Sequence, residues 1–279
     1  MATQTVKPTD HKLLVAGEWS EGIGWQEVES PYDGTVVGRV AQADEATAIR
    51  AIEAAHHAFE IADFPQHERA AVLDRAAALV RERVDDLART IAAEAGKPLK
   101  TATVEASRCV DTLTFSAVEA RKLTGGTVPM DASTGGVGKL GVMLRVPYGV
   151  VGAITPFNFP LNLVAHKVAP AIAAGCPFVL KPSEKTPVGA LIIGEVLAET
   201  DLPKGAFSIL PLDGAHAAPL VEDGRFRLLS FTGGQIGWDL KARAGHKKVT
   251  LELGGNAACI VDADQGAKLG KVVERLIFG

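Results

Sequence analysis

Cysteine, aromatic residues and long apolar runs are scarce in this chain of 279 residues, and each scarcity excludes a class of protein. Its three cysteines lie far apart and form no CxxC pair, so neither a disulfide framework nor a metal site is expected. No apolar stretch reaches the roughly 18 residues that span a bilayer, so no membrane partner is expected. The formal net charge is −4, without the basic excess that would indicate a nucleic-acid partner.

The residues that are abundant indicate a globular protein. Hydrophobic residues make up 47% of the chain and charged residues 22%, with 29 glycines. At this length the chain can hold one large or two ordinary domains, since domains usually have roughly 100–200 residues. Its first residues lack the basic and apolar run of a signal peptide, so we expect a cytoplasmic protein.

The cysteines are interpreted as packing residues. Cys109 lies in a helical run, whereas Cys176 and Cys259 lie within or beside apolar, strand-like segments. Because free cysteine is among the most buried residue types, we expect each to be a small buried hydrophobe rather than a nucleophile.

Before residue 122 the patterns are mostly helical. Asp44 can cap a helix over 44–60, and apolar residues at helical spacing predict a second over 68–95 and a third over 99–123. Between Lys122 and Tyr148, two Gly-Gly pairs flank a proline and the stretch 140–146 alternates loosely as a strand does. That section predicts a hairpin that projects from the body.

After Tyr148, strands and helices alternate with short connections. Apolar strands are predicted over 150–154, 178–180, 207–210, 228–231 and 249–251, separated by helices over 161–174 and 188–199, a short helix from 215 and another from about 235. Strands that are apolar throughout indicate a parallel sheet covered by helices on both faces. We therefore expect a doubly wound α/β fold, with ligands bound at the carboxyl ends of the strands.

The first polar residues at such an end lie in 155–160. Asn158 stands between two aromatic residues and two prolines, so its amide is held in a stiff, largely apolar turn. An amide fixed in this way can donate to a developing oxyanion. Alternatively, Asn158 caps the helix that begins near Leu161.

After the next strand comes Lys181-Pro182-Ser183-Glu184, again at a carboxyl end. A lysine and a carboxylate three residues apart suit a ribose, because the carboxylate accepts from the two hydroxyls and the ammonium donates. The alternative is an exposed ion pair in a loop.

Glycines follow the fourth strand, in Phe231-Thr232-Gly233-Gly234-Gln235-Ile236-Gly237. They allow close backbone approach, and the helix that follows offers free N–H groups to a phosphate. This stretch lacks the GxGxxG pattern of dinucleotide-binding turns. Its interpretation as a phosphate-binding turn therefore rests on its position between a strand and a helix.

A carboxylate ends the fifth strand, in Leu251-Glu252-Leu253-Gly254-Gly255. An apolar setting would raise the pKa of Glu252 and suit it to general-base chemistry, and the glycines leave room for a ligand. Alternatively, Glu252 simply leaves the edge of the sheet for water.

Together these segments resemble the NAD(P)-dependent aldehyde dehydrogenase family from about Leu13 onward. The matching stretches, in the family's order and spacing, are Ile154-Thr-Pro-Phe-Asn-Phe-Pro160, Ala173-Ala-Gly-Cys-Pro-Phe-Val-Leu-Lys-Pro-Ser-Glu184, Leu229-Ser-Phe-Thr-Gly-Gly234 and Val249-Thr-Leu-Glu-Leu-Gly-Gly-Asn256. The resemblance implies a Rossmann-like cofactor domain with a helical N-terminal part (1–121), an oligomerisation hairpin (122–147), the NAD-binding sheet (148–262) and the start of a catalytic domain (263–279).

The resemblance also implies roles for individual residues. Asn158 would steady the oxyanion and Glu252 would be the general base. The residues expected to bind NAD, or alternatively NADP, are Ile154, Thr155, Pro156, Phe157, Lys181, Ser183, Glu184, Phe231, Gly233, Gly234, Gly237 and Leu253. Because Glu184 would repel a 2′-phosphate, it favours NAD.

Two departures from the family pattern stand out. Gly234 replaces a common serine, and the stretch 233–237 is one residue shorter than usual. The family's catalytic cysteine lies beyond the glutamate, after a helix that here would cover 264–278, so we expect a chain that ends before its nucleophile. The apolar stripe of that helix needs a packing partner, which favours truncation. Alternatively, Gly279 is a genuine cap and the stripe packs on the existing sheet.

The implied reaction is the oxidation of a small aldehyde through a cysteine thiohemiacetal to a thioester, which Glu252 then helps water to hydrolyse. An intact protein would be a homo-oligomer. The alternative is a catalytically inactive module that binds a dinucleotide or joins subunits.

Overall fold

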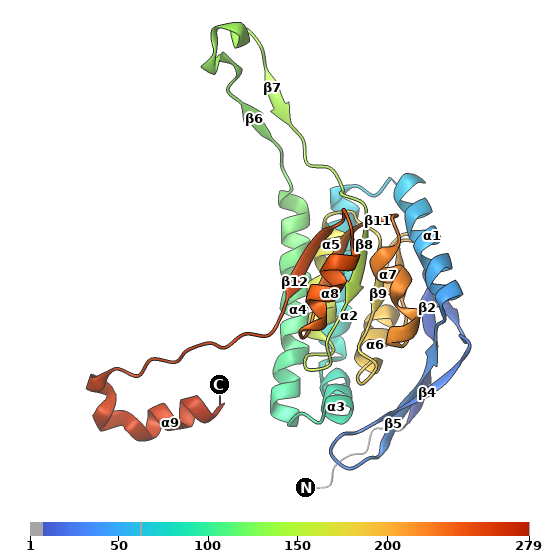
Figure 1. Cartoon of the computed structure of the whole chain (residues 1–279), viewed down its shortest axis with the longest axis vertical. Helices are drawn as coiled ribbons and strands as arrows, with labels where there is room; N and C mark the ends of the chain where they lie inside the picture. The colour runs from blue at the N-terminus through green and yellow to red at the C-terminus, as the bar shows by residue number, and fades with distance from the viewer. Residues whose placement is uncertain (1–7, 62, 279) are drawn as a thin grey trace.

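The computed structural model describes residues 8–61 and 63–278, which form an α/β fold around a seven-stranded sheet (Figure 1). The strand order is β12-β11-β8-β9-β10-β2-β3. The strands are β2 Leu13–Val15, β3 Glu18–Ser20, β8 Val150–Ile154, β9 Phe178–Lys181, β10 Phe207–Ile209, β11 Phe226–Thr232 and β12 Lys248–Glu252. The five strands from β8 to β12 run parallel, as the sequence predicts. At one edge, β2 and β3 are antiparallel additions.

Helices cover both faces of this sheet, which confirms the doubly wound arrangement. One face carries α1 Glu45–Ile61, α7 Ala218–Glu222 and α8 Ile236–Arg243. The other carries α5 Asn162–Ala173 and α6 Val188–Ala198, backed by α2 Gln66–Glu82, α3 Val84–Ala95 and α4 Leu99–Lys122.

The central strand β9 explains why the predicted strands are apolar throughout. Every residue of β9 is buried. Phe178 and Leu180 face the core that contains α2 to α6, whereas Val179 faces the core that contains α1. Successive side chains of a strand point to opposite faces. In a strand covered on both sides, each side chain therefore packs in one core or the other, which favours apolar residues throughout.

Two expectations for the N-terminal part need correction. The single helix over 68–95 is two helices, because the backbone of Arg83 leaves helical geometry between α2 and α3. Five strands precede α1, although the sequence was expected to be mostly helical there. Besides β2 and β3 they are β1 Thr9–His11, β4 Gly24–Glu29 and β5 Val36–Gln42, which form a separate sheet. Of these, β1, β2 and β3 have three residues each, which is too short to display an alternating pattern.

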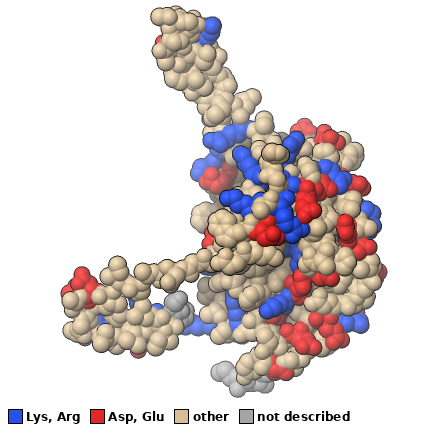
Figure 2. Space-filling model, viewed as in Figure 1, with Lys and Arg blue, Asp and Glu red and all other residues tan. Residues whose placement is uncertain are grey.

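The predicted hairpin is present and projects from the body (Figure 1). Strands β6 Gly126–Val128 and β7 Gly141–Met143 pair antiparallel, and short 3-10 turns, η1 Met130–Ala132 and η2 Thr134–Gly136, lie between them. Its large apolar side chains are exposed: Val128, Met130, Val137, Leu140, Val142, Met143, Leu144 and Val146. In Figure 2 the hairpin is almost free of charge, whereas the body carries intermixed positive and negative groups.

The last described helix also presents apolar residues to solvent. After β12, residues 253–262 form no helix or strand, and they lead to η4 Ala263–Lys268 and α9 Leu269–Phe278, which lie away from the sheet (Figure 1). Leu269, Val273, Leu276 and Ile277 are exposed. The alternative that this stripe packs on the sheet is therefore wrong, and Gly279 lies outside the described residues.

None of the helices in residues 8–61 and 63–278 has the length and apolar character that crossing a bilayer requires.

The remaining 3-10 helix, η3 Gly214–His216, precedes α7.

The exposed apolar residues of the hairpin and of α9 predict that the 279-residue chain associates in solution, because such surface rarely stays uncovered. Light scattering coupled to size exclusion should give a mass above 29.2 kDa. A variant with Leu144→Lys, Val146→Lys, Leu276→Lys and Ile277→Lys should return toward the monomer mass, whereas His57→Lys on the body should not. A monodisperse monomer for the unaltered chain would contradict this prediction.

Candidate functional site

The parallel register brings the predicted site residues to one edge of the sheet. Ile154, at the end of β8, is paired with Lys181 of β9 on one side and with Phe231 of β11 on the other. Thr232 of β11 is in turn paired with Glu252 of β12. The loops that follow these four strands therefore begin side by side, although 98 residues of sequence separate Ile154 from Glu252 (252 − 154).

The loop after β8 presents an amide that has no partner. Thr155 is buried and donates its backbone N–H to the carbonyl of Lys181 at 3.1 Å, while Ile154 and Pro156 are half-buried. Phe157 and Asn158 are exposed, and the Asn158 side chain forms no hydrogen bond with any described residue.

The alternative that Asn158 caps the following helix is wrong. Helix α5 begins at Asn162, and its N-cap position, Leu161, provides no side-chain hydrogen bond. The first backbone N–H groups of α5 donate instead to Glu105 of α4. The Asn158 amide is therefore free to donate to a bound group.

Lys181 and Glu184 form the predicted pair. Lys181 Nζ lies 3.2 Å from Glu184 Oε1 and 3.4 Å from the carbonyl oxygen of Pro182. The alternative of an exposed loop pair is only half correct, because Lys181 is 7% exposed. Glu184 keeps 44% of its side chain exposed, and the Ser183 hydroxyl accepts from the backbone N–H of Lys185. A buried ammonium beside a half-exposed carboxylate can both donate to and accept from a diol.

Close packing explains the glycines after β11. A Cβ on buried Gly237 would lie 2.5 Å from Leu253 Cδ2 and 3.0 Å from the ring of Phe231, so α8 lies directly on these two side chains. A Cβ on Gly233 would lie 2.6 Å from Phe231 Cζ, and the Gly233 N–H donates to the carbonyl of Glu252 at 2.9 Å. Gly234 faces open space. The turn therefore places the start of α8 at the same edge, with open space beside Gly234.

Glu252 ends the edge strand β12, and its side chain is exposed. The expected apolar setting is therefore not met among the described residues, and the geometry is that of the alternative, a carboxylate that leaves the sheet edge for water. Its neighbours Leu251 and Leu253 are half-buried and pack against the cluster that includes Phe231.

Sequence reasoning missed Lys167, which belongs to this edge. It lies on α5 and is 8% exposed, with Nζ donating to Ser230 Oγ at 2.9 Å and to Thr232 Oγ1 at 3.0 Å. Burial lowers the pKa of Lys167 to about 8, while the nearby charge of Glu252 acts to raise it. The sequence signal was available, since Lys167 is three residues from Val164 and so shares the buried face of α5.

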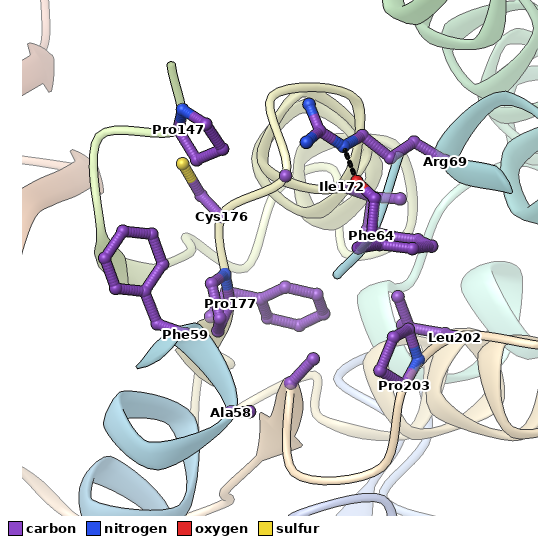
Figure 3. A pocket seen from close by; sticks show the side chains of 13 residues that line it. Ala58, Phe59, Phe64, Arg69, Pro147, Ile172, Cys176, Pro177, Leu202 and Pro203 are labelled. Atoms are coloured by element: carbon purple, nitrogen blue, oxygen red, sulfur yellow. Dashed lines mark hydrogen bonds between the residues drawn. The ribbon is translucent and has the colours of Figure 1, made fainter. Parts of the chain in front are cut away.

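The cysteines lie elsewhere. Cys109 is buried in α4, where burial raises its pKa far above the usual range. Cys176 is also buried and lines a cavity of about 60 Å³ at the opposite, amino end of the strands (Figure 3). Figure 3 shows the sulfur of Cys176 beside Pro147, and none of the predicted site residues lines this cavity. The prediction is wrong for Cys259, which is exposed in a segment, 253–262, that forms no helix or strand.

This chain belongs to the aldehyde dehydrogenase family. The family model, described as "Aldehyde dehydrogenase family", matches residues 19–279. Aspartate-semialdehyde dehydrogenase 1 of Pseudomonas canavaninivorans is 42% identical over 255 residues, which is 91% of this chain and 54% of that protein. The crystal structure of aldehyde dehydrogenase 21 from Physcomitrella patens, in complex with the reaction product succinate, has a TM-score of 0.93 and 45% identity. The match covers 98% of this chain and 58% of that one. The chain thus spans about half the length of the relatives it matches.

Relatives of this chain use both nicotinamide dinucleotides. Betaine aldehyde dehydrogenase from Staphylococcus aureus, in complex with NAD+, has a TM-score of 0.84 and 29% identity over 90% of this chain and 52% of its own. Succinate-semialdehyde dehydrogenase [NADP(+)] of Escherichia coli (strain K12) is 38% identical over 94% of this chain and 55% of its own length.

Replacing Gly237 should destabilise the chain. In Gly237→Ala the new methyl would overlap Leu253 and Phe231, and relief of such overpacking costs about 1–3 kcal/mol. Gly234→Ala is the matched control, because its methyl would meet open space and should change stability by less than about 0.5 kcal/mol. Urea unfolding of the two variants measures the difference, and equal midpoints would refute this packing argument.

Lys167 should make stability depend on pH in the alkaline range. Its folded-state pKa is about 8, against an ordinary 10.5, so between these values the unfolded chain binds more protons. The free energy of unfolding therefore gains a contribution that rises with pH from 8 to 10.5. Lys167→Met should remove that rise, measured by urea unfolding at pH 7.5 and 9.5, whereas Lys100→Met on the surface should retain it. A rise that persists in Lys167→Met would contradict the assignment.

Proposed function

We propose that this chain supplies the dinucleotide site, the oxyanion-stabilising amide and the general base for NAD(P)-dependent oxidation of an aldehyde to a carboxylic acid. The observation that supports this most strongly is the shared register of β9, β8, β11 and β12, which gathers four groups of suitable chemistry at one edge. Membership of the aldehyde dehydrogenase family supports the reaction class.

The chemistry of these residues fits a dinucleotide. The buried Lys181 ammonium and the half-exposed Glu184 carboxylate suit the hydroxyls of a ribose. Gly233 and Gly234 let the backbone approach a pyrophosphate, and the first N–H groups of α8 favour negative charge. Ile154, Thr155, Pro156 and Phe157 would contact the cofactor from β8, and Ser183, Phe231, Gly237 and Leu253 would shape its surroundings. When bound, a nicotinamide supplies the hydride acceptor.

Glu184 favours NAD over NADP in this proposal. Its carboxylate remains near Lys181, at the position where a 2′-phosphate would bring a second negative charge. Repulsion between the two would weaken NADP, whereas the two free hydroxyls of NAD can both donate to Glu184.

The remaining steps of the proposed reaction use three side chains of this chain, those of Asn158, Glu252 and Lys167. The unpartnered Asn158 amide donates to the oxygen of the aldehyde as negative charge develops there. Glu252 accepts a proton from the water that completes the reaction. Lys167 lies close enough to feel the charge of Glu252 and, with its pKa near 8, can exchange a proton near neutral pH.

The second candidate is a module that binds a dinucleotide or joins subunits without turnover. It is favoured by the exposed apolar hairpin, a surface suited to subunit contact, and by the placement of the cysteines. Cys109 and Cys176 are buried, and Cys259 lies in an exposed segment without helix or strand, so no thiol of the described residues is both accessible and held by a helix or strand.

Titration calorimetry with NAD tests the proposed site. We expect binding that Lys181→Met weakens about tenfold, because a charge-assisted hydrogen bond is lost. Lys204→Met is the control, since Lys204 forms an exposed ion pair with Glu18 at 3.7 Å and should leave affinity unchanged. Neither protein should form NADH when an aldehyde is added.

Both candidates share the cofactor site, so the titration tests that site together with the argument from the cysteines. NAD binding without turnover supports the cofactor site and agrees with the placement of the cysteines. Aldehyde-dependent NADH formation would refute the argument from the cysteines, and failure to bind either dinucleotide would refute the cofactor site.

A further inference from the structure

The two loops that follow β8 and β9, the first of which carries Asn158, each lead into a helix whose first backbone groups bond to another layer of the fold. The N-cap positions of α5 and α6, Leu161 and Pro187, provide no side-chain hydrogen bond. A helix begins with backbone N–H groups that have no acceptor within the helix, and a local serine, threonine or aspartate normally accepts from one of them. Here the acceptors come from helices behind α5 and α6.

Glu105 of α4 is the acceptor for α5. Its Oε1 accepts from the backbone N–H groups of Leu161 at 3.0 Å and Asn162 at 3.2 Å, and Glu105 is 2% exposed. A carboxylate buried so deeply is stabilised only when its lone pairs are satisfied. The start of α5, four residues after Asn158, is therefore bonded to α4 rather than to its own loop.

Lys97 links Glu105 to the loop that carries Asn158. It lies between α3 and α4, its Nζ is 2.6 Å from Glu105 Oε2, and the same Nζ stands 3.6 Å from the ring centroid of Phe159. Phe159 is the residue directly after Asn158. One ammonium thus joins the buried carboxylate and the aromatic side chain of the loop, through a charge pair and a cation–π contact.

The neighbouring helix shows the same construction. Glu94 of α3 is 1% exposed and accepts from the backbone N–H groups of Val188 and Gly189, each at 2.9 Å. A Cβ on Gly189 would lie 2.8 Å from Glu94 Oε1 and 3.7 Å from the carbonyl oxygen of Pro160, so the start of α6 lies against the end of the Asn158 loop. Burial raises the pKa of Glu94 to about 8, although the two N–H donors lower it.

We propose that Lys97 and Glu105 are positioning residues that hold the 155–161 loop, and with it Asn158 and the residues before it, in the geometry needed to bind a dinucleotide. Neither residue is among those expected to touch the dinucleotide. They act through the beginning of α5 and the ring of Phe159. This inference rests on the proposed function for its effect on binding. The clamp, which consists of the contacts of Lys97 and Glu105 with Phe159, Leu161 and Asn162, can be tested without any ligand.

The test combines amide hydrogen exchange with NAD titration on the full chain. In Lys97→Met, exchange of the backbone amides in 155–162 should be about tenfold faster, as expected for the loss of one charge-assisted contact, while amides of β10 keep their rates. The dissociation constant for NAD should rise about tenfold. Lys97→Arg, which retains the charge, should restore both. Glu105→Gln should likewise accelerate exchange at Leu161 and Asn162.

Lys122→Met is the matched control, because Lys122 forms a Glu–Lys pair with Glu119 at 2.8 Å on the same helix, with both side chains exposed. It should change neither exchange in the loop nor the NAD constant. Unchanged exchange in 155–162 in Lys97→Met would overturn the proposal, as would an equal acceleration in β10, which would indicate general destabilisation. If the unaltered chain binds no NAD, the cofactor site fails, and the exchange rates alone decide whether the clamp exists.

Discussion

Parallel pairing of β9, β8, β11 and β12, which aligns the carboxyl ends of the four strands, is the constraint on which the candidate site depends. The hydrogen bonds of the ladder fix the ends of these strands side by side, so the loops that follow must start from one line. Burial on both faces keeps the register in place, because a slip of one residue would turn Phe178 and Leu180 from one core to the other. The packing of apolar residues in the two cores therefore determines where the polar groups at the carboxyl edge lie.

Ionisable groups buried near this edge hold the loops and helices together through hydrogen bonds. Lys167, Lys181, Glu94 and Glu105 are each less than a tenth exposed, and each has hydrogen-bond partners. Buried ionic groups are stabilising only when fully partnered, so their presence beside loops of proposed function suggests that geometry, more than stability, is what they provide. They link the carboxyl edge to the helices behind it, so the loops do not rely on their own sequences for order.

Much of the edge could be predicted from sequence. Five strands, the helices between them and the hairpin follow from apolar runs, glycines and prolines, because these patterns are local. Lys181 and Glu184 were paired correctly, since three residues stiffened by Pro182 leave little freedom. Predictions failed where the outcome depends on contacts distant in sequence. The break at Arg83, the short strands before α1 and the exposure of Cys259 all have causes outside their own segments.

The sequence by itself therefore determined the fold class, the family and the residues that lie at strand ends. These follow from the spacing of apolar residues, the positions of glycine and proline, and the order of the motifs, all of which are properties of the chain alone. Only the tertiary structure decided which groups are buried and what partners them. It assigned the start of α5 to Glu105 instead of Asn158, brought Lys167 to the strand that carries Ser230 and Thr232, and left Glu252 exposed. The physical reason is that burial and hydrogen bonding arise between layers, where residues far apart along the chain become neighbours.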